Sequence, residues 1–236
     1  MHASLKLFGL VALFAAAACS ANSGSDADAA ATAPETPAMA DAAPAPAMPA
    51  APAADASVPA PQLQAAMRDL WHGHIVHARE YALAMHAGNA ADAKTAADAV
   101  VANAHQIADA VAGFYGQAGG DRMMELLGGH WGAVKALTDA RAKGDNAAAD
   151  KAMTDLTTNA GEIAKFLAGA NPNLPEDTVR GLMLAHGAHH AQQIQQIMTD
   201  DMQDEATTWT AMQQHMDVIA DALAGAIAKQ FPDKAS

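Results

Sequence analysis

The chain has 236 residues, is rich in alanine and poor in aromatic residues, and carries a formal net charge of −13 at pH 7. Helix-favouring residues dominate and β-branched residues rarely alternate with polar ones, so the composition predicts an all-α protein. The part after residue 61 holds 21 acidic and 12 basic residues without a Lys/Arg cluster, which argues against binding to nucleic acid or to an anionic membrane surface.

Residues 1–19 are typical of an export signal that ends in a lipidated cysteine. An apolar run at 7–18, too short to span a bilayer, precedes Cys19, the only cysteine of the chain. Three alanines before Cys19 resemble the lipobox of bacterial lipoproteins, although Ala16 stands where that family prefers leucine. Ser20 follows the cysteine, which by the same resemblance implies sorting to the outer membrane. We expect an outer-membrane lipoprotein that faces the periplasm; cleavage before Cys19 without lipidation would give a soluble periplasmic protein.

Residues 20–61 predict a disordered linker. The segment consists mostly of Ala, Pro, Asp, Ser and Thr, and it contains eight of the eleven prolines. Proline removes backbone donors, and no apolar periodicity offsets the entropy of ordering such a segment. The linker would tether a folded domain to the membrane.

Residues 62–236 contain three copies of one unit. The sequence LWHGH at 70–74 recurs as LLGGH at 126–130 and as LMLAH at 182–186, at a constant step of 56 residues. The same step relates Asn103, Asn159 and His215, and also Ile107, Ile163 and Ile219. A fixed period held by several columns without gaps marks an internal repeat. The units span about 64–119, 120–175 and 176–233.

Each unit predicts a helical hairpin. Apolar residues recur at helical spacing on either side of a short turn, such as Gly88-Asn89 in the first unit and Gly144-Asp145 in the second. Because one hairpin cannot bury its own apolar stripe, we predict six helices packed as a compact bundle, in which the three hairpins could be related by a pseudo-threefold axis. A short open α-solenoid is the alternative.

The repeat places a histidine in every hairpin. His74 lies about as far before its turn as Asn103 lies after it, so the two should face each other across the hairpin. The same count pairs His130 with Asn159, and His186 with His215. Buried polar side chains need partners. A His–Asn clasp that fixes helix packing, a metal site and a polar cavity for an organic ligand all remain open.

A metal site is the sharper hypothesis. If the hairpins close around an axis, His74, His130 and His186 converge, and we take these with His215 as candidate ligands. Imidazoles suit Zn, Cu or Ni. Asn103 and Asn159 would act as supporting or clasping residues. His186, His189 and His190 also share one helix face, and the many methionines are expected mainly as core residues.

No catalytic motif accompanies these histidines. A phosphate-binding loop, a nucleophile elbow, a HExxH motif and a CxxC motif are all missing from the sequence. We therefore expect a non-enzymatic protein that binds a metal ion or a small ligand. The alternatives are a structural or interaction module and a metal-dependent enzyme.

Several motifs together resemble an uncharacterised family of bacterial exported helical-bundle proteins. They are LWxxH at 70–74, LLxxH at 126–130, NAxxIAxFLxxANPN at 159–173 and QFP at 230–232. The resemblance covers about residues 66–233 and implies a shared role for His74, His130, His186 and His215. It implies no particular activity.

Overall fold

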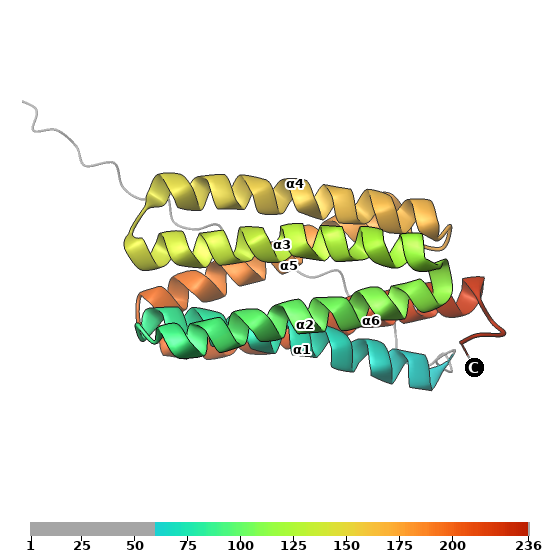
Figure 1. Cartoon of the computed structure of the whole chain (residues 1–236), viewed down its shortest axis with the longest axis horizontal. Coiled ribbons are helices and arrows are strands. Elements are labelled where there is room, and N and C mark those ends of the chain that lie inside the picture. The colour runs from blue at the N-terminus through green and yellow to red at the C-terminus, as the bar shows by residue number, and fades with distance from the viewer. Residues whose placement is uncertain (1–59, 236) are drawn as a thin grey trace, which may run out of the picture. The chain divides into compact units, whose positions relative to one another are not determined.

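The computed structural model describes residues 60–235, which form six helices joined by short turns, without a strand in that range (Figure 1). The helices are α1 (Pro61–His86), α2 (Ala90–Tyr115), α3 (Gln117–Lys143), α4 (Asn146–Ala170), α5 (Glu176–Met198) and α6 (Met202–Gln230). The all-α prediction is thus confirmed. The predicted export signal, Cys19 and nearly all of the linker lie outside the described residues. Among the described helices, none is both long and apolar enough to cross a membrane.

Local sequence sets the three hairpin turns. Gly88 and Gly144 adopt positive φ angles of 67° and 68°, and Asp200 takes the equivalent place in the third hairpin at 60°. Aspartate tolerates this left-handed conformation better than most residues with a side chain. The next residue caps the following helix in each case, as when the side chain of Asn89 accepts a hydrogen bond from the backbone N–H of Asp92.

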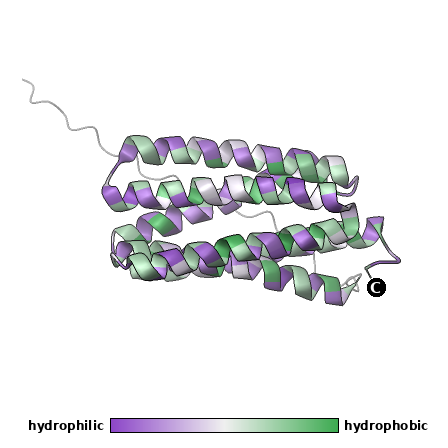
Figure 2. Ribbon diagram, viewed as in Figure 1, coloured by the Kyte–Doolittle hydropathy of each residue, from purple (hydrophilic) through white to green (hydrophobic). Residues whose placement is uncertain are grey.

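The six helices form a closed bundle. Each helix packs against the next, and α6 returns to pack against α1, so the open solenoid is wrong. The helices α1, α3 and α5 also contact one another, whereas α2, α4 and α6 pack mainly against two neighbours each. Apolar and polar residues are interspersed along every helix, as expected for amphipathic helices in a bundle (Figure 2). The histidine-bearing helices of the three hairpins therefore meet inside the bundle.

A polar layer divides the apolar core into two clusters. Asn103 lies between Val100 of one cluster and Ala104 of the other. On α3, His130 lies in the same way between Leu127 and Trp131. The layer also holds the other buried members of the repeated columns, which are His74, Asn159, His186 and His215. The repeated polar side chains thus share one level of the bundle, with an apolar cluster along the helices on each side.

One hydrogen bond recurs in every hairpin at this level. Nδ2 of Asn103 donates to the carbonyl oxygen of Leu70 at 2.9 Å, and Nδ2 of Asn159 donates to that of Leu126 at 2.9 Å. In the third hairpin, Nε2 of His215 lies 2.9 Å from the carbonyl oxygen of Leu182. Each acceptor is four residues before the histidine of its hairpin, so the bond fixes the two helices at matching heights.

The asparagines hold the hairpins together through a helix carbonyl, a partner that the predicted clasp between His and Asn did not include. A carbonyl oxygen in a helix keeps a second lone pair after its helical bond, so it can accept the amide proton. The glycine before each of the first two histidines admits the amide: a Cβ built on Gly73 would lie 2.9 Å from Nδ2 of Asn103.

We predict that Gly73→Ala and Gly128→Ala have different effects on stability. Alanine in a helix normally gains about 0.5–1 kcal/mol over glycine, and a Cβ on Gly128 meets nothing within 4 Å. At Gly73 the new methyl group displaces the Asn103 amide, and the lost hydrogen bond costs about 1 kcal/mol. Urea denaturation should show a higher midpoint for Gly128→Ala and an unchanged or lower one for Gly73→Ala. An equal gain at both sites would contradict the clasp.

Candidate metal centre

Four histidines meet in the polar layer. His74 comes from α1, His130 from α3, and His186 and His190 from successive turns of α5. Each offers one ring nitrogen, and the four nitrogens all lie within 4.8 Å of one another. The ring centroids are between 4.5 Å (His186 to His190) and 5.9 Å (His74 to His190) apart. We call these four residues the histidine centre.

The histidine centre is shielded from water. Its members are only 2–4 % exposed. Burial lowers the pKa of His74 to about 3, and the neighbouring His130 lowers it further. Burial also lowers the pKa of His130 to about 4, although the Asn159 amide raises it in return. Burial and the neighbouring imidazoles also hold the pKa values of His186 and His190 well below their usual range. All four rings are therefore neutral at pH 7 and offer lone pairs.

Most ring nitrogens of the centre have no hydrogen-bond partner. Both nitrogens of His74, both of His130 and Nδ1 of His186 are buried and unpartnered. The Nε2 atoms of His186 and His190 lie 3.1 Å apart, so one must carry a proton and the other a lone pair. Leaving a buried donor or acceptor unpaired costs about 1–3 kcal/mol for each group. Such a concentration of unpaired nitrogens marks the histidine centre as a candidate binding site.

Two amide oxygens complement these rings. Each amide donates its NH₂ group to a backbone carbonyl. Its oxygen, Oδ1 of Asn103 or of Asn159, is buried and has no hydrogen-bond partner. Histidines that bind a metal usually donate their second ring N–H to such an acceptor, which orients the ring. Asn159 acts on the pKa of His130 and is therefore close enough to play this part.

The structure places His215 outside the centre. Its ring lies 6.4 Å from that of His186 and 5.2 Å from that of His189, and its Nε2 faces the carbonyl oxygen of Leu182. His215 thus serves as the clasp of the third hairpin in place of asparagine. Its predicted place among the ligands is taken by His190.

The repeat gives no indication that His190 belongs to the centre. The equivalent positions in the first two units are Ala78 and Val134, so no column of the repeat points to it. Its spacing of four residues from His186 was the available signal, because residues i and i+4 of a helix share a face. Two of the four candidate ligands therefore come from one helix, which no threefold pattern predicts.

The remaining histidines do not join the centre. His72 lies 3.0 Å from a carboxylate oxygen of Asp217, and His86 lies 2.8 Å from one of Asp200. His77 faces Glu80 on the same helix, and His105 is exposed. These residues therefore supply control positions for experiments on the centre.

The one buried carboxylate of the described residues is already neutralised. Glu205 is 1 % exposed and accepts hydrogen bonds from Nε of Arg79 at 2.6 Å and from Nε2 of Gln193 at 2.8 Å. The bond from Arg79 is the main reason that the pKa of Glu205 is lowered. In the described part of the chain, the group of candidate ligands contains histidines alone. The centre therefore carries no charge of its own.

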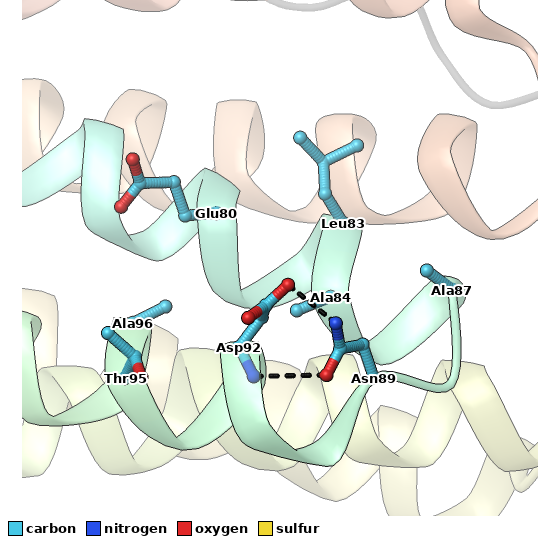
Figure 3. A pocket seen from close by; sticks show the side chains of 8 residues that line it. All are labelled: Glu80, Leu83, Ala84, Ala87, Asn89, Asp92, Thr95 and Ala96. Carbon is cyan, nitrogen blue, oxygen red and sulfur yellow. Dashed lines mark hydrogen bonds between the residues drawn. The ribbon is translucent and has the colours of Figure 1, made fainter.

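A separate surface pocket lies where α1 turns into α2 (Figure 3). Its rim includes the exposed Glu80, Thr95 and the cap formed by Asn89 and Asp92, whose side chains bond to each other. This polar cap completes the start of α2 and leaves no buried group in need of a ligand. The histidine centre is thus the stronger candidate site.

Comparisons with protein-family models, with curated proteins and with solved structures give no match to this chain. The resemblance to a family of exported helical bundles stays a prediction. Any function assigned to this chain must come from the geometry of its own residues.

We predict that the metal-free protein loses stability as the pH falls below about 6.5. The unfolded chain binds protons at its histidines there, at pKa values near 6.5. The folded centre does not bind them until near pH 3 to 4, as the values for His74 and His130 show. A proton bound only by the unfolded state favours unfolding, and at pH 5 the cost for His74 is about 2 kcal/mol.

Urea denaturation at pH 7.5 and pH 5 measures this effect. The midpoint should fall at pH 5 for the wild type and for His105→Gln, and it should fall less for His74→Gln, which removes one buried titrating group. Equal midpoints for the wild type at the two pH values would contradict the burial of neutral imidazoles.

Proposed function

We propose that this protein binds one transition-metal ion through His74, His130, His186 and His190. The observation that carries the proposal is the set of buried, unpartnered ring nitrogens within 4.8 Å of one another. Coordination would use one lone pair from each ring and offset the cost of burying these nitrogens without partners. The Asn103 and Asn159 amide oxygens would then accept second-nitrogen protons of their hairpin histidines.

The donor set favours Zn, Cu or Ni. Neutral imidazoles suit these ions, whereas carboxylates and carbonyls suit Mg, Ca or Mn. The chain's only cysteine, Cys19, lies before the described residues, and the buried carboxylate of Glu205 is engaged by Arg79. Imidazole nitrogens are therefore the ligands that the centre offers, and they suit these ions.

The number of ligands supports binding in preference to catalysis. Four protein ligands complete a tetrahedral shell, whereas catalytic zinc sites keep a position open for water or substrate. A non-enzymatic role in holding the ion therefore fits the centre better than a metal-dependent enzyme does. A purely structural module is the second candidate, favoured by the recurrent bonds from Asn103, Asn159 and His215, but these bonds leave the imidazoles of the centre unexplained.

Metal analysis of the purified full-length protein tests the proposal. After chelator treatment and dialysis against Zn²⁺, Cu²⁺ or Ni²⁺, the wild type should retain one ion per chain for at least one of them. The triple variant His74→Ala, His130→Ala, His186→Ala should retain none, while His105→Ala should match the wild type. An ion at 100 times its dissociation constant should add about 2.7 kcal/mol to the free energy of unfolding.

Two results would reject the proposal. One is a wild-type protein that retains none of the three ions and melts at the same temperature with and without them. The other is retention of an ion by the triple variant at the wild-type ratio, which would place the binding at histidines outside the proposed ligand set.

We also propose that the protein is anchored to the outer membrane through lipid on Cys19. The support is the apolar run at 7–18, the alanines that precede the cysteine, and the proline-rich segment that separates it from the bundle. Acyl chains on one residue can hold a protein at a membrane without a spanning helix.

Expression of the complete chain in a Gram-negative host tests the anchor. We expect the wild type to incorporate labelled palmitate and to sediment with outer membranes, and Cys19→Ala to lose the label and appear in the soluble periplasmic fraction. An unlabelled wild-type protein found in the soluble fraction would exclude the lipid anchor.

A further inference from the structure

The third hairpin carries two buried histidines beside the histidine centre. His189 is 7 % exposed and His215 is 3 % exposed. His215 stands where the other hairpins have Asn103 and Asn159. His189 repeats the position of His77, but His77 is half-buried and faces Glu80, whereas His189 is buried against another imidazole. The two residues therefore form a pair found in this hairpin alone among the three described.

The pair has the spacing of rings that share a ligand. The centroids of His189 and His215 are 5.2 Å apart, within the range found among the four rings of the centre. The ring of His215 is stacked beside that of His186 at 6.4 Å with an interplanar angle of 18°. The pair is therefore contiguous with the centre, through His215 and His186.

Both rings have a nitrogen free to coordinate an ion. A carbonyl oxygen only accepts hydrogen bonds, so Nε2 of His215 must donate its proton to Leu182. The neutral ring then has a lone pair on Nδ1. On the other ring, Nδ1 of His189 is buried and has no partner. The pair thus contains its own unsatisfied buried nitrogen, in addition to those in the centre.

His189 lies closer to the solvent than the centre does. Its exposure of 7 % exceeds the 2 % of His186 and His190 on the same helix. An ion that enters from water must exchange its water ligands for imidazoles before it reaches a dry interior. A partly hydrated site with two imidazoles would provide the intermediate step.

We propose that His189 and His215 form a transfer site that binds the incoming metal ion first and hands it to His186 and the rest of the centre. The inference depends on the proposed function, because it needs an ion in the centre. Two divalent ions separated by little more than one ring spacing in the protein interior would repel strongly, so the two sites are occupied in turn and not together. The transfer exchanges one set of neutral nitrogen ligands for another and leaves the oxidation state of the ion unchanged.

The repeat supplies a matched variant. Asn103 and Asn159 show that asparagine makes the clasp bond, and they do so next to Gly73 and Gly129, whose lack of a side chain leaves room for the amide. The third hairpin has Ala185 at the glycine position. The double variant Ala185→Gly, His215→Asn should therefore keep the clasp and remove only the imidazole. His189→Gln provides a second, independent variant.

The test compares the rate of metal uptake with the affinity at equilibrium. The full-length metal-free protein is mixed with Zn²⁺ bound to a coloured chelator, and the colour change is followed by stopped flow. Both variants should end with one ion per chain at wild-type affinity but load it more slowly. We expect a change of about tenfold, the lower end of the effects on affinity or activity when supporting residues near a metal are removed. His105→Gln should load at the wild-type rate.

The outcomes separate the two proposals. Wild-type loading rates in both variants would overturn the transfer site and leave the centre intact. A loss of equilibrium affinity without a change in rate would also overturn it, because the pair would then support the bound ion. A wild-type protein that takes up no Zn²⁺ at equilibrium would instead count against the proposed function. Unchanged helical circular dichroism and melting in the metal-free state confirm that each variant is folded.

Discussion

The main constraint on this structure is the burial of neutral imidazoles, whose ring nitrogens need hydrogen-bond partners or ligands, inside an apolar bundle. His74, His130, His186 and His190 bring their ring nitrogens together where water is excluded, and most of these nitrogens lack a partner. Two apolar clusters along the helices make the cost of this arrangement high, because a low local dielectric penalises unpaired polar groups. The same surroundings would strengthen the bonds of an ion placed among the rings. A site that destabilises the empty protein and stabilises the occupied one couples binding to folding.

The rest of the fold serves to bring these rings to one level. Closure of the bundle between α1 and α6 places α1, α3 and α5 against one another. The bond from Asn103 to the Leu70 carbonyl, with its counterparts in the other hairpins, prevents the paired helices from sliding. Neighbouring residues of a helix differ by about 1.5 Å in height and roughly 100° in direction. A shift of one residue between the paired helices would therefore take the histidine out of the centre. The clasps are thus a condition for the site, because they hold its histidines at one level.

Much of this could be predicted from the sequence, because it follows from local periodicity. Helix geometry alone predicts the turns at Gly88 and Gly144 and the common level of His74 and Asn103. The helices of the structure end at these turns. The acceptor of the Asn103 amide could not be predicted, since a backbone carbonyl is present at every residue and leaves no mark in the sequence. His190 was missed because it lies outside the repeat. Which of His190 and His215 enters the centre depends on how α5 is rotated against α1 and α3, and the apolar stripe of a helix does not fix that rotation closely enough.

X-ray absorption at the metal edge of the loaded, full-length protein measures the ligands of the bound ion most directly. For zinc we expect a single shell of four nitrogen ligands at about 2.0–2.1 Å, with the multiple-scattering pattern of imidazole. His190→Ala should reduce the imidazole count from four to three, and His215→Asn with Ala185→Gly should leave it at four. A first shell dominated by carboxylate or water oxygens, or an imidazole count that does not change in His190→Ala, would contradict the assignment of the centre.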